Sequence, residues 1–367
     1  MDEETKCWVA FSVFPGIGPV RFRLLLDYFG SAKAAWNARS QELRSIHLGD
    51  TLTEKFGSFR KSFDCDTYLS QLAKMHVSVL TLSDSRYPAL LRQITDAPFV
   101  LYIRGKKSNT PWNINRAIAV VGTRKATNYG VDVTQRLVRE LVSYGFTIVS
   151  GLAYGIDAVA HQTAIDAGGK TIAVLGCGID IIAPPSNARL YRAIAQEGHG
   201  AVVAEMPLGL RPNKGLFPAR NRIISGLSLG VLVTEGTDDS GALITAGYAG
   251  TQGREVFAVP GPITSPYSRG PAKLLKNGAK LVESANDIIE ELGIKTSLQA
   301  DKSVHTQIKA ENKEEQEIVS ALSDRHMHMN EIVRATSLTI SEVAATLTVL
   351  EMKGIVRDYG EKEYGLI

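Results

Sequence analysis

Residues 117–151 read AIAVVGTRKATNYGVDVTQRLVRELVSYGFTIVSG. The segment opens and closes on short apolar runs, 117–122 and 147–151, which are typical of buried β-strands. Between them VDVTQRLVRELVSYG has the spacing of an amphipathic helix, and Gly145 suits the position just after a helix end. A strand, a glycine turn, a helix and a second strand make one unit of a parallel sheet.

The same unit repeats toward the C-terminus. Further apolar runs occur at 171–176, 201–206, 230–236 and 255–261. They are nearly continuous, as expected for parallel strands covered by helices on both faces. We therefore predict an α/β fold with an extended Rossmann-like, doubly wound parallel sheet over residues 113–293.

The flanking regions differ from this core. Residues 1–66 have helical periodicity, and residues 67–112 contain two strand-like runs, VSVLTL and FVLYIRG, that we expect to join the sheet. Residues 294–312 are polar and indicate a linker. Residues 313–367 give three short helices followed by a β-hairpin, which predicts a winged helix.

The N-terminal stretch FPGIGPVRFRLLLDYFG resembles one helix-hairpin-helix element, so residues 1–66 are expected to be a SAM-like or helix-hairpin-helix-like domain. Its GIG turn could present backbone N–H groups to a phosphate, with Arg21 and Arg23 close by in sequence. SAM-like domains use the same turn only to cross two helices. Both interpretations stay open.

Charge is unevenly distributed along the chain. The net charge is +3, but residues 313–367 hold six Lys or Arg and ten Asp or Glu, and the other residues hold 35 cations and 28 anions. A polyanion should therefore bind outside the winged helix. The predicted second helix of that domain, ISEVAATLTVLEMKG, also lacks the Arg and Asn residues of a base-reading helix, so we expect a protein-contact or regulatory role.

Composition sets the remaining limits. The chain has 367 residues with 44% hydrophobic content, and no apolar run is long enough for a membrane span. Its beginning, MDEETK, does not resemble a secretory leader. Three widely spaced cysteines fit neither a disulfide framework nor a CxxC metal site. We expect a cytoplasmic protein without a metal or cofactor.

Three glycine-rich turns follow predicted strands and precede helices. They are GTRKATNYG (122–130), SGLAYGIDAVAH (150–161) and EGTDDSGALITAG (235–247). Such turns suit phosphate groups because their N–H groups point outward at helix starts. GxGxxG and GxxxxGK[ST] are both absent, which opposes a dinucleotide cofactor and a P-loop. The glycines also permit tight turns without any ligand.

The segment NKGLFPARNRIISGLS (213–228) follows the fourth strand of this domain, at the same edge of the sheet. Its cations and Arg124 are expected to converge on one pocket with Phe217 exposed among them. Cations track a phosphate backbone and an aromatic ring stacks on bases, which favours single-stranded nucleic acid. Alternatively, Phe217 belongs to the core and Arg220 or Arg222 caps a carbonyl.

These motifs resemble the DNA-processing protein A family (DprA, also called Smf). The similarity covers VGTRKATNYG, SGLAYGIDAVAHQTAI, LGCGIDIIAPPSN, KGLFPARNRIISGLS, TEGTDDSGALITA and a VPG at 259–261. It implies binding and protection of single-stranded DNA without sequence preference, and loading of the RecA recombinase onto it in natural transformation and DNA recombination. It also implies a homodimer formed through the Rossmann domain.

The resemblance assigns the DNA contacts to Arg124, Lys214 and Phe217, and the pocket walls to the Ser150-Gly151 and Ser240-Gly241 turns. The full set of candidate DNA-binding residues is Gly122, Thr123, Arg124, Tyr129, Ser150, Gly151, Lys214, Phe217, Arg220, Asn221, Arg222, Ser240 and Gly241. No catalytic residue is assigned, and we expect binding without catalysis.

Two other functions compete with this one. A nucleotide-processing enzyme of the phosphoribohydrolase kind would use the same pocket, with Glu205 and Glu235 at the strand ends. Asp157 and His161 face each other at i, i+4 spacing, which we interpret as a structural hydrogen-bonded pair rather than an acid–base pair. The third alternative is a winged-helix regulator of duplex DNA.

Overall fold

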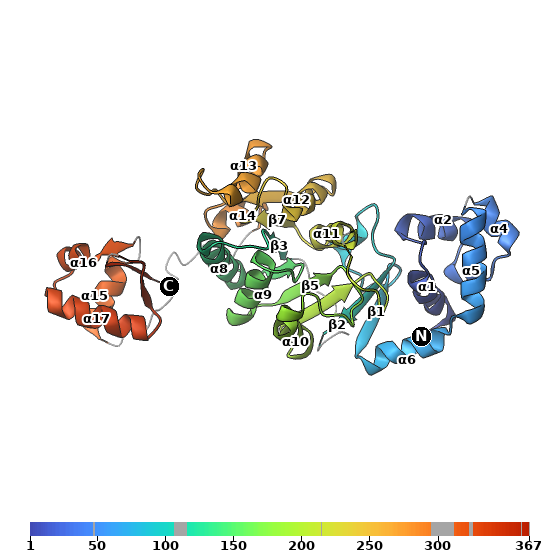
Figure 1. Ribbon diagram of the computed structural model, residues 1–367, viewed down its shortest axis with the longest axis horizontal. Helices are drawn as coiled ribbons and strands as arrows, with labels where there is room; N and C mark the ends of the chain where they lie inside the picture. The colour runs from blue at the N-terminus through green and yellow to red at the C-terminus, as the bar shows by residue number, and fades with distance from the viewer. Residues whose placement is uncertain are drawn as a thin grey trace. The chain divides into compact units, whose positions relative to one another are not determined.

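The computed structural model describes residues 1–46, 48–105, 116–213, 215–294, 312–322, 326–360 and 362–366. It divides into two compact units, Met1–Lys295 and Thr296–Ile367 (Figure 1). The predicted linker at 294–312 lies outside the described residues except for its two end positions.

The described strands of the first unit form one sheet in the order β1-β2-β6-β5-β4-β3-β7-β8-β9. Pairing is parallel from β6 to β9, whereas β1 and β2 add an antiparallel edge. The bounds are β1 Val77–Thr81, β2 Val100–Arg104, β3 Ala117–Val121, β4 Thr147–Ser150, β5 Thr171–Leu175, β6 Gly200–Ala204, β7 Gly230–Val233, β8 Glu255–Ala258 and β9 Lys280–Leu281. The doubly wound sheet is confirmed; the short strand β9 was not predicted.

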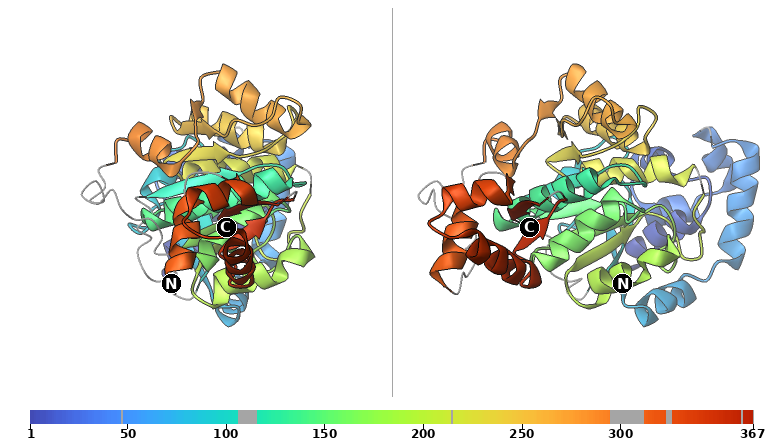
Figure 2. Two further views of the ribbon diagram at one scale, coloured as in Figure 1. Left: turned by 90° about the vertical axis from the view of Figure 1, so that its left-hand side faces the viewer. Right: turned by 60° about the vertical axis from the view of Figure 1, so that its left-hand side comes forward.

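Helices cover both faces of this sheet (Figures 1 and 2). Successive residues of β3 point to opposite faces, so Ala119 packs in the cluster with α11 and α12, while Ile118 packs in the cluster with α8 and α9. The bounds are α7 Ala89–Arg92, α8 Asn128–Ser143, α9 Ile156–Asp166, α10 Ala188–Gln196, α11 Leu216–Gly226, α12 Gly241–Thr251, α13 Arg269–Lys276 and α14 Ala285–Glu291. Gly145 follows α8 with φ +78°, as the glycine after a helix end requires.

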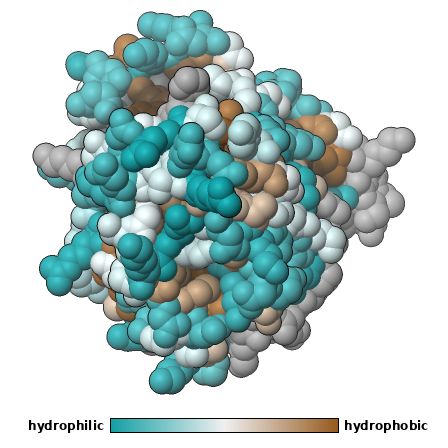
Figure 3. All heavy atoms as spheres, turned by 90° about the vertical axis from the view of Figure 1, so that its right-hand side faces the viewer, coloured by the Kyte–Doolittle hydropathy of each residue, from teal (hydrophilic) through white to brown (hydrophobic). Residues whose placement is uncertain are grey.

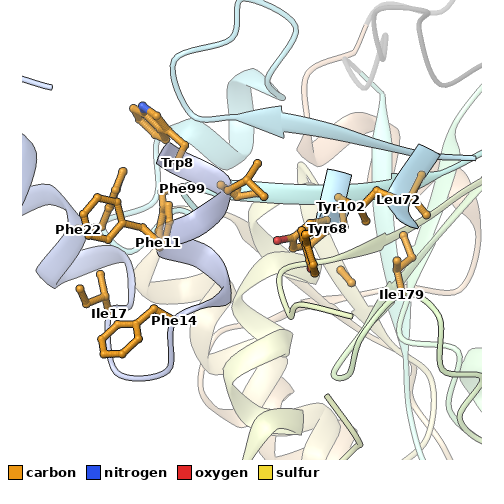
Figure 4. Close-up of a cluster of buried hydrophobic side chains, with 14 of the residues drawn as sticks. Trp8, Phe11, Phe14, Ile17, Phe22, Tyr68, Leu72, Phe99, Tyr102 and Ile179 are labelled. Atoms are coloured by element: carbon orange, nitrogen blue, oxygen red, sulfur yellow. The ribbon is translucent and has the colours of Figure 1, made fainter. Parts of the chain in front are cut away.

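The N-terminal helices pack through aromatic side chains (Figure 4). Phe11 stacks on Phe56 with ring centres 5.2 Å apart, and Phe22 stacks on Phe99 at 4.0 Å. Phe99 precedes β2, so the second stack joins the helices to the edge of the sheet. The bounds are α1 Glu3–Val13, α2 Pro19–Phe29, α3 Ala32–Asn37, α4 Ser40–Ser45, α5 Asp50–Ser62 and α6 Cys65–Lys74. Helix α6 continues across residue 66, where the sequence analysis ended the helical region.

The face of the first unit that carries these helices is mainly hydrophilic, with scattered hydrophobic patches (Figure 3). Val20, Leu24 and Tyr28 on α2 are among the exposed large apolar side chains. The two arginines of α2 are held by backbone carbonyls: Arg21 donates to Gly16 O at 2.6 Å and Arg23 to Thr95 O at 2.9 Å.

The second unit is a winged helix, as predicted. Its bounds are α15 Lys313–Ala321, β10 Met327–His328, α16 Met329–Ala335, α17 Ile340–Met352, β11 Val356–Asp358 and β12 Glu363–Leu366. The exposed side chains of α17 include Ile340, Val349 and Met352, which are apolar. Within the described residues no single helix has the length and composition of a membrane span, although α16 and α17 meet that test together as a pair bent by 112°.

Candidate nucleic-acid interface

A pocket of about 390 Å³ opens at the carboxyl ends of β3 and β7. The strand order reverses between these two neighbours, which is where doubly wound folds bind ligands. The turn after β3, the loop after β4, the first turns of α11 and the start of α12 line it. Of the candidate residues, the lining contains Gly122, Thr123, Arg124, Phe217, Arg220, Asn221, Ser240 and Gly241.

Arg124 and Phe217 meet at this pocket although they are far apart in sequence. The Cζ atom of Arg124 lies 5.1 Å from the centre of the Phe217 ring, within cation–π range. Phe217 is in the first turn of α11 and is only partly buried. Arg124 is exposed and forms no ion pair with any described residue. Its charge is therefore available to a ligand.

Arg220 lies in the buried wall of the pocket. Its Nη1 donates to Gly151 O at 2.7 Å and also to Val174 O, and its Nε donates to Asn221 Oδ1 at 3.2 Å. These bonds join α11 to the ends of β4 and β5. Burial lowers the pKa of Arg220, and the Asp157 carboxylate opposes that shift. Arg220 thus holds the loops around the pocket in place.

Asp157 balances this buried cation. Its Oδ2 accepts hydrogen bonds from Gly151 N at 3.1 Å and Ala153 N at 3.3 Å. Burial raises the pKa of Asp157, whereas Arg220 and these N–H donors pull it down. The carboxylate therefore organises the loop between β4 and α9.

The expected hydrogen bond between Asp157 and His161 is absent from the described structure, and that prediction was wrong. The Nδ1 of His161 lies 2.6 Å from Thr171 Oγ1, whose hydroxyl donates to Ile148 O. Thr171 therefore accepts from His161, which assigns the proton to Nδ1. His161 is fully enclosed. This burial lowers its pKa to about 3, so the imidazole is neutral at physiological pH.

Glu235 fills the anion position at the start of α8. This buried carboxylate follows β7 and accepts from Thr127 N at 3.0 Å and Thr127 Oγ1 at 2.6 Å. It lies so close to the helix that a Cβ on Gly130 would be 1.9 Å from Glu235 Oε2. A helix N-terminus attracts anions, and here an internal carboxylate takes the place that a nucleotide phosphate would need. The sequence analysis had placed Glu235 at this edge without identifying its bonds to Thr127.

Arg222 points away from the pocket, so the expectation that it converges with Arg124 is corrected. Its Nε lies 3.0 Å from Asp96 Oδ2 and its Nη2 lies 2.7 Å from Glu205 Oε1. It lines a separate, mainly apolar cavity of about 600 Å³ beside the N-terminal helices. Residues two positions apart on a helix point to different faces, so Arg220 and Arg222 cannot both face the pocket. Both side chains are buried, each on its own face of α11.

Three other candidates lie outside the pocket lining. Ser150 is buried and its hydroxyl donates to Val120 O at 2.7 Å. Gly151 is also buried, behind the Arg220 guanidinium that its carbonyl binds. Tyr129 is exposed, and its hydroxyl donates to Pro260 O. Gly151 supports the pocket only through its carbonyl, which accepts from Arg220, and none of the three lines the pocket.

Lys214 lies outside the described residues. The rim of the pocket near the start of α12 carries a carboxylate, because Asp239 lines it; this side chain accepts from Thr237 Oγ1 at 2.6 Å. The described residues contain no group of three His, Cys, Asp or Glu side chains arranged to hold a metal ion.

Comparison with known proteins places the chain in a family. The model of the DNA recombination-mediator protein A family matches residues 78–293, and that of the DprA winged helix domain matches residues 305–360. The chain belongs to this family. The similarity detected in the GTR, SGLAYGID and KGLF motifs is thereby confirmed at the level of the family.

Relatives cover most of the chain. Protein Smf of Synechocystis is 35% identical over 97% of both chains. The X-ray structure of DprA from Streptococcus pneumoniae superposes with a TM-score of 0.68 at 33% identity, covering 78% of this chain and 97% of that one. DprA from Helicobacter pylori, whose structure was described for its single-stranded DNA binding mode, gives a TM-score of 0.52 at 30% identity over 59% and 96%. Members of this family are DNA-processing proteins.

Proposed function

We propose that the chain binds single-stranded DNA without sequence preference in the pocket at the ends of β3 and β7. The observation that carries this proposal is the guanidinium of Arg124, 5.1 Å from the ring of Phe217. A free cation attracts a phosphate, and a partly exposed ring offers a stacking face that every base can use. The single-stranded DNA binding described for the relative from H. pylori supports the same ligand.

The charges around the pocket indicate the side on which the backbone runs. Phosphates are attracted to Arg124 and repelled by Asp239 on the α12 rim. The backbone therefore follows the Arg124 turn after β3, and the bases point toward Phe217, Asn221 and Gly241. We also propose Lys214, which directly precedes Gly215 in the sequence, as a second cation for the phosphates.

A nucleotide-processing enzyme is the weaker alternative. Glu235 already occupies the α8 N-terminus, where a monophosphate would bind. His161 is enclosed and has its own partner, and Glu205 is held by Arg222. We therefore propose binding without a catalytic step.

The resemblance to the family supports a wider role. We propose that the protein protects single strands and loads RecA onto them during natural transformation or recombination, in the cytoplasm and as a homodimer formed through the Rossmann domain. The winged helix has an acidic composition and exposed apolar side chains on α17, which suit a protein partner better than duplex DNA.

Fluorescence anisotropy with labelled oligo-dT and three competitors tests the ligand class. Unlabelled single strands should displace the label, whereas duplex of equal length and nucleoside monophosphates should not. Displacement by monophosphates, with release of free base, would instead establish the enzyme.

Replacing Phe217 with alanine should weaken oligo-dT binding by about 1–3 kcal/mol, because a base loses its stacking partner. The salt slope, which is the change in the logarithm of affinity with the logarithm of salt concentration, should hardly change, since the phosphates keep all their cations. Phe217→Trp is the matched control and should retain binding because it keeps a stacking face. A salt slope as strongly reduced as that of a cation variant would show that Phe217 acts through Arg124 and not through a base.

Deleting residues 313–367 should leave oligo-dT affinity unchanged within about twofold, because the segment carries a net charge of −4 and the pocket lies in the first unit. Anisotropy titrations of the full and shortened chains measure this. A collapse of binding would assign DNA contact to the winged helix.

A further inference from the structure

Tyr154 is an exposed aromatic side chain beside the pocket that the sequence analysis did not select. It is 50% exposed, and its hydroxyl has no hydrogen-bond partner among the described residues. It lies in the loop between β4 and α9, directly after Ala153, which lines the pocket. Half of the surface of this residue is therefore accessible to a ligand.

The loop that carries Tyr154 is fixed against the Arg124 turn. Ile156 N donates to Thr123 O at 3.1 Å. Gly155 has φ +71°, and a Cβ there would lie 2.3 Å from Thr123 O and 2.9 Å from Arg124 Cα. Only glycine allows this approach. The Tyr154 backbone is thus held one residue away from the turn that presents Arg124.

On its other side the same loop is tied to the start of α10. The amide of Asn187 donates to Leu152 O at 3.0 Å and to Ala153 O at 3.1 Å. Asn187 is the residue before α10, and α9 and α10 are neighbouring helices (Figure 1). Bonds at both ends therefore limit the movement of the backbone that carries Tyr154, which lowers the entropy cost of ordering this loop on binding.

Exposed arginines lie on both elements to which the Tyr154 loop is bonded. Arg124 lies toward the pocket, and Arg189 and Arg192 lie at i, i+3 spacing on α10. None of the three forms an ion pair with a described residue. An exposed aromatic ring on a loop that is bonded to two elements with unpaired cations suits a single strand, with phosphates on the cations and a base on the ring.

We infer that Tyr154 is a second stacking platform, and that the strand leaves the pocket past Arg124, places a base on Tyr154 and continues toward Arg189. This inference rests on the proposed function. It extends the site from the pocket to a longer binding surface, the track, which comprises Arg124, Tyr154 and Arg189. Its ligand is a single strand longer than the pocket itself, so Tyr154 matters for long strands and not for short ones.

Two lengths of oligo-dT test the track, a short one of about 4 nucleotides and a long one of about 16, which are the two ends of the usual range of single-strand site sizes. With the long strand, Tyr154→Ala should lose about 5- to 100-fold in affinity, and with the short one it should match the wild type. Tyr154→Phe should retain binding because the hydroxyl is not used. Tyr359→Ala, an exposed tyrosine of the second unit, is the matched control.

Arg189→Glu supplies a second, independent measurement. It should lower the salt slope by about 0.7 or more for the long strand and leave the slope of the short strand unchanged. If the wild type binds neither strand, the proposed function fails. If the wild type binds both and Tyr154→Ala behaves as wild type with the long strand, or loses both lengths equally, only the track is overturned. Thermal melting of each variant identifies any loss of fold.

Discussion

Arg124→Glu is expected to abolish measurable binding of oligo-dT, with a loss of at least about 100-fold, or about 2.7 kcal/mol. The substitution removes the exposed guanidinium beside Phe217 and sets a carboxylate against the phosphates. Because one phosphate no longer meets a cation, the salt slope should also fall by about 0.7 for a single strand. Anisotropy titrations at several salt concentrations give both quantities.

The fold should survive this change, because Arg124 is exposed and forms no ion pair within the described residues. Arg139→Glu is the matched control: Arg139 is an exposed arginine of α8 outside the pocket lining, and its reversal alters net charge equally. Equal affinities of the two variants would mean that overall charge, and not the pocket, attracts the strand.

Arg220→Leu is expected to destabilise the first unit by about 3–5 kcal/mol, because it leaves the buried Asp157 carboxylate without its cation. The carbonyls of Gly151 and Val174 lose their donor as well. Urea unfolding measures the loss. Arg139→Leu, the same exchange at an exposed position of α8, should cost less than about 0.5 kcal/mol.

The loss of unfolding free energy in Arg220→Leu should depend on pH. Burial raises the pKa of Asp157 above the ordinary 3.8, and removal of Arg220 raises it further. A raised carboxyl pKa means that the folded state binds its proton more tightly than the unfolded state, so stability falls as pH rises above 3.8. The gap between variant and wild type should therefore be wider at about pH 8 than at about pH 5. A pH-independent gap would show that Asp157 does not depend on Arg220.

Much of the fold was predictable because its signals are local. The runs 117–122 and 171–176 are apolar enough to indicate buried parallel strands, and β3 and β5 lie within them. The glycine turns marked the correct edge of the sheet, because every parallel strand of a doubly wound domain ends there. β9, with two residues, is too short to give such a signal.

The site was predictable only in part, because side-chain partners are distant in sequence. Arg220 and Arg222 look equivalent in the sequence, yet Arg222 turns to Asp96, which is 126 positions away, and Arg220 turns to the loop after β4. Glu235 bonds to Thr127 across 108 positions. Asp157 and His161 have the spacing of a hydrogen-bonded pair, but Asp157 accepts from Gly151 N and His161 bonds to Thr171. Sequence spacing shows which residues share one face of a helix. It does not show which distant residues pack against that face.

Photo-cross-linking of an iodouridine-substituted oligo-dT to the full chain, followed by mass-spectrometric mapping of the attached peptide, identifies the residues that lie against the strand. We expect attachment to the peptide that contains Phe217, and loss of that product in Arg124→Glu. Cross-links confined to the winged helix or to α2, with none at the start of α11, would contradict this expectation.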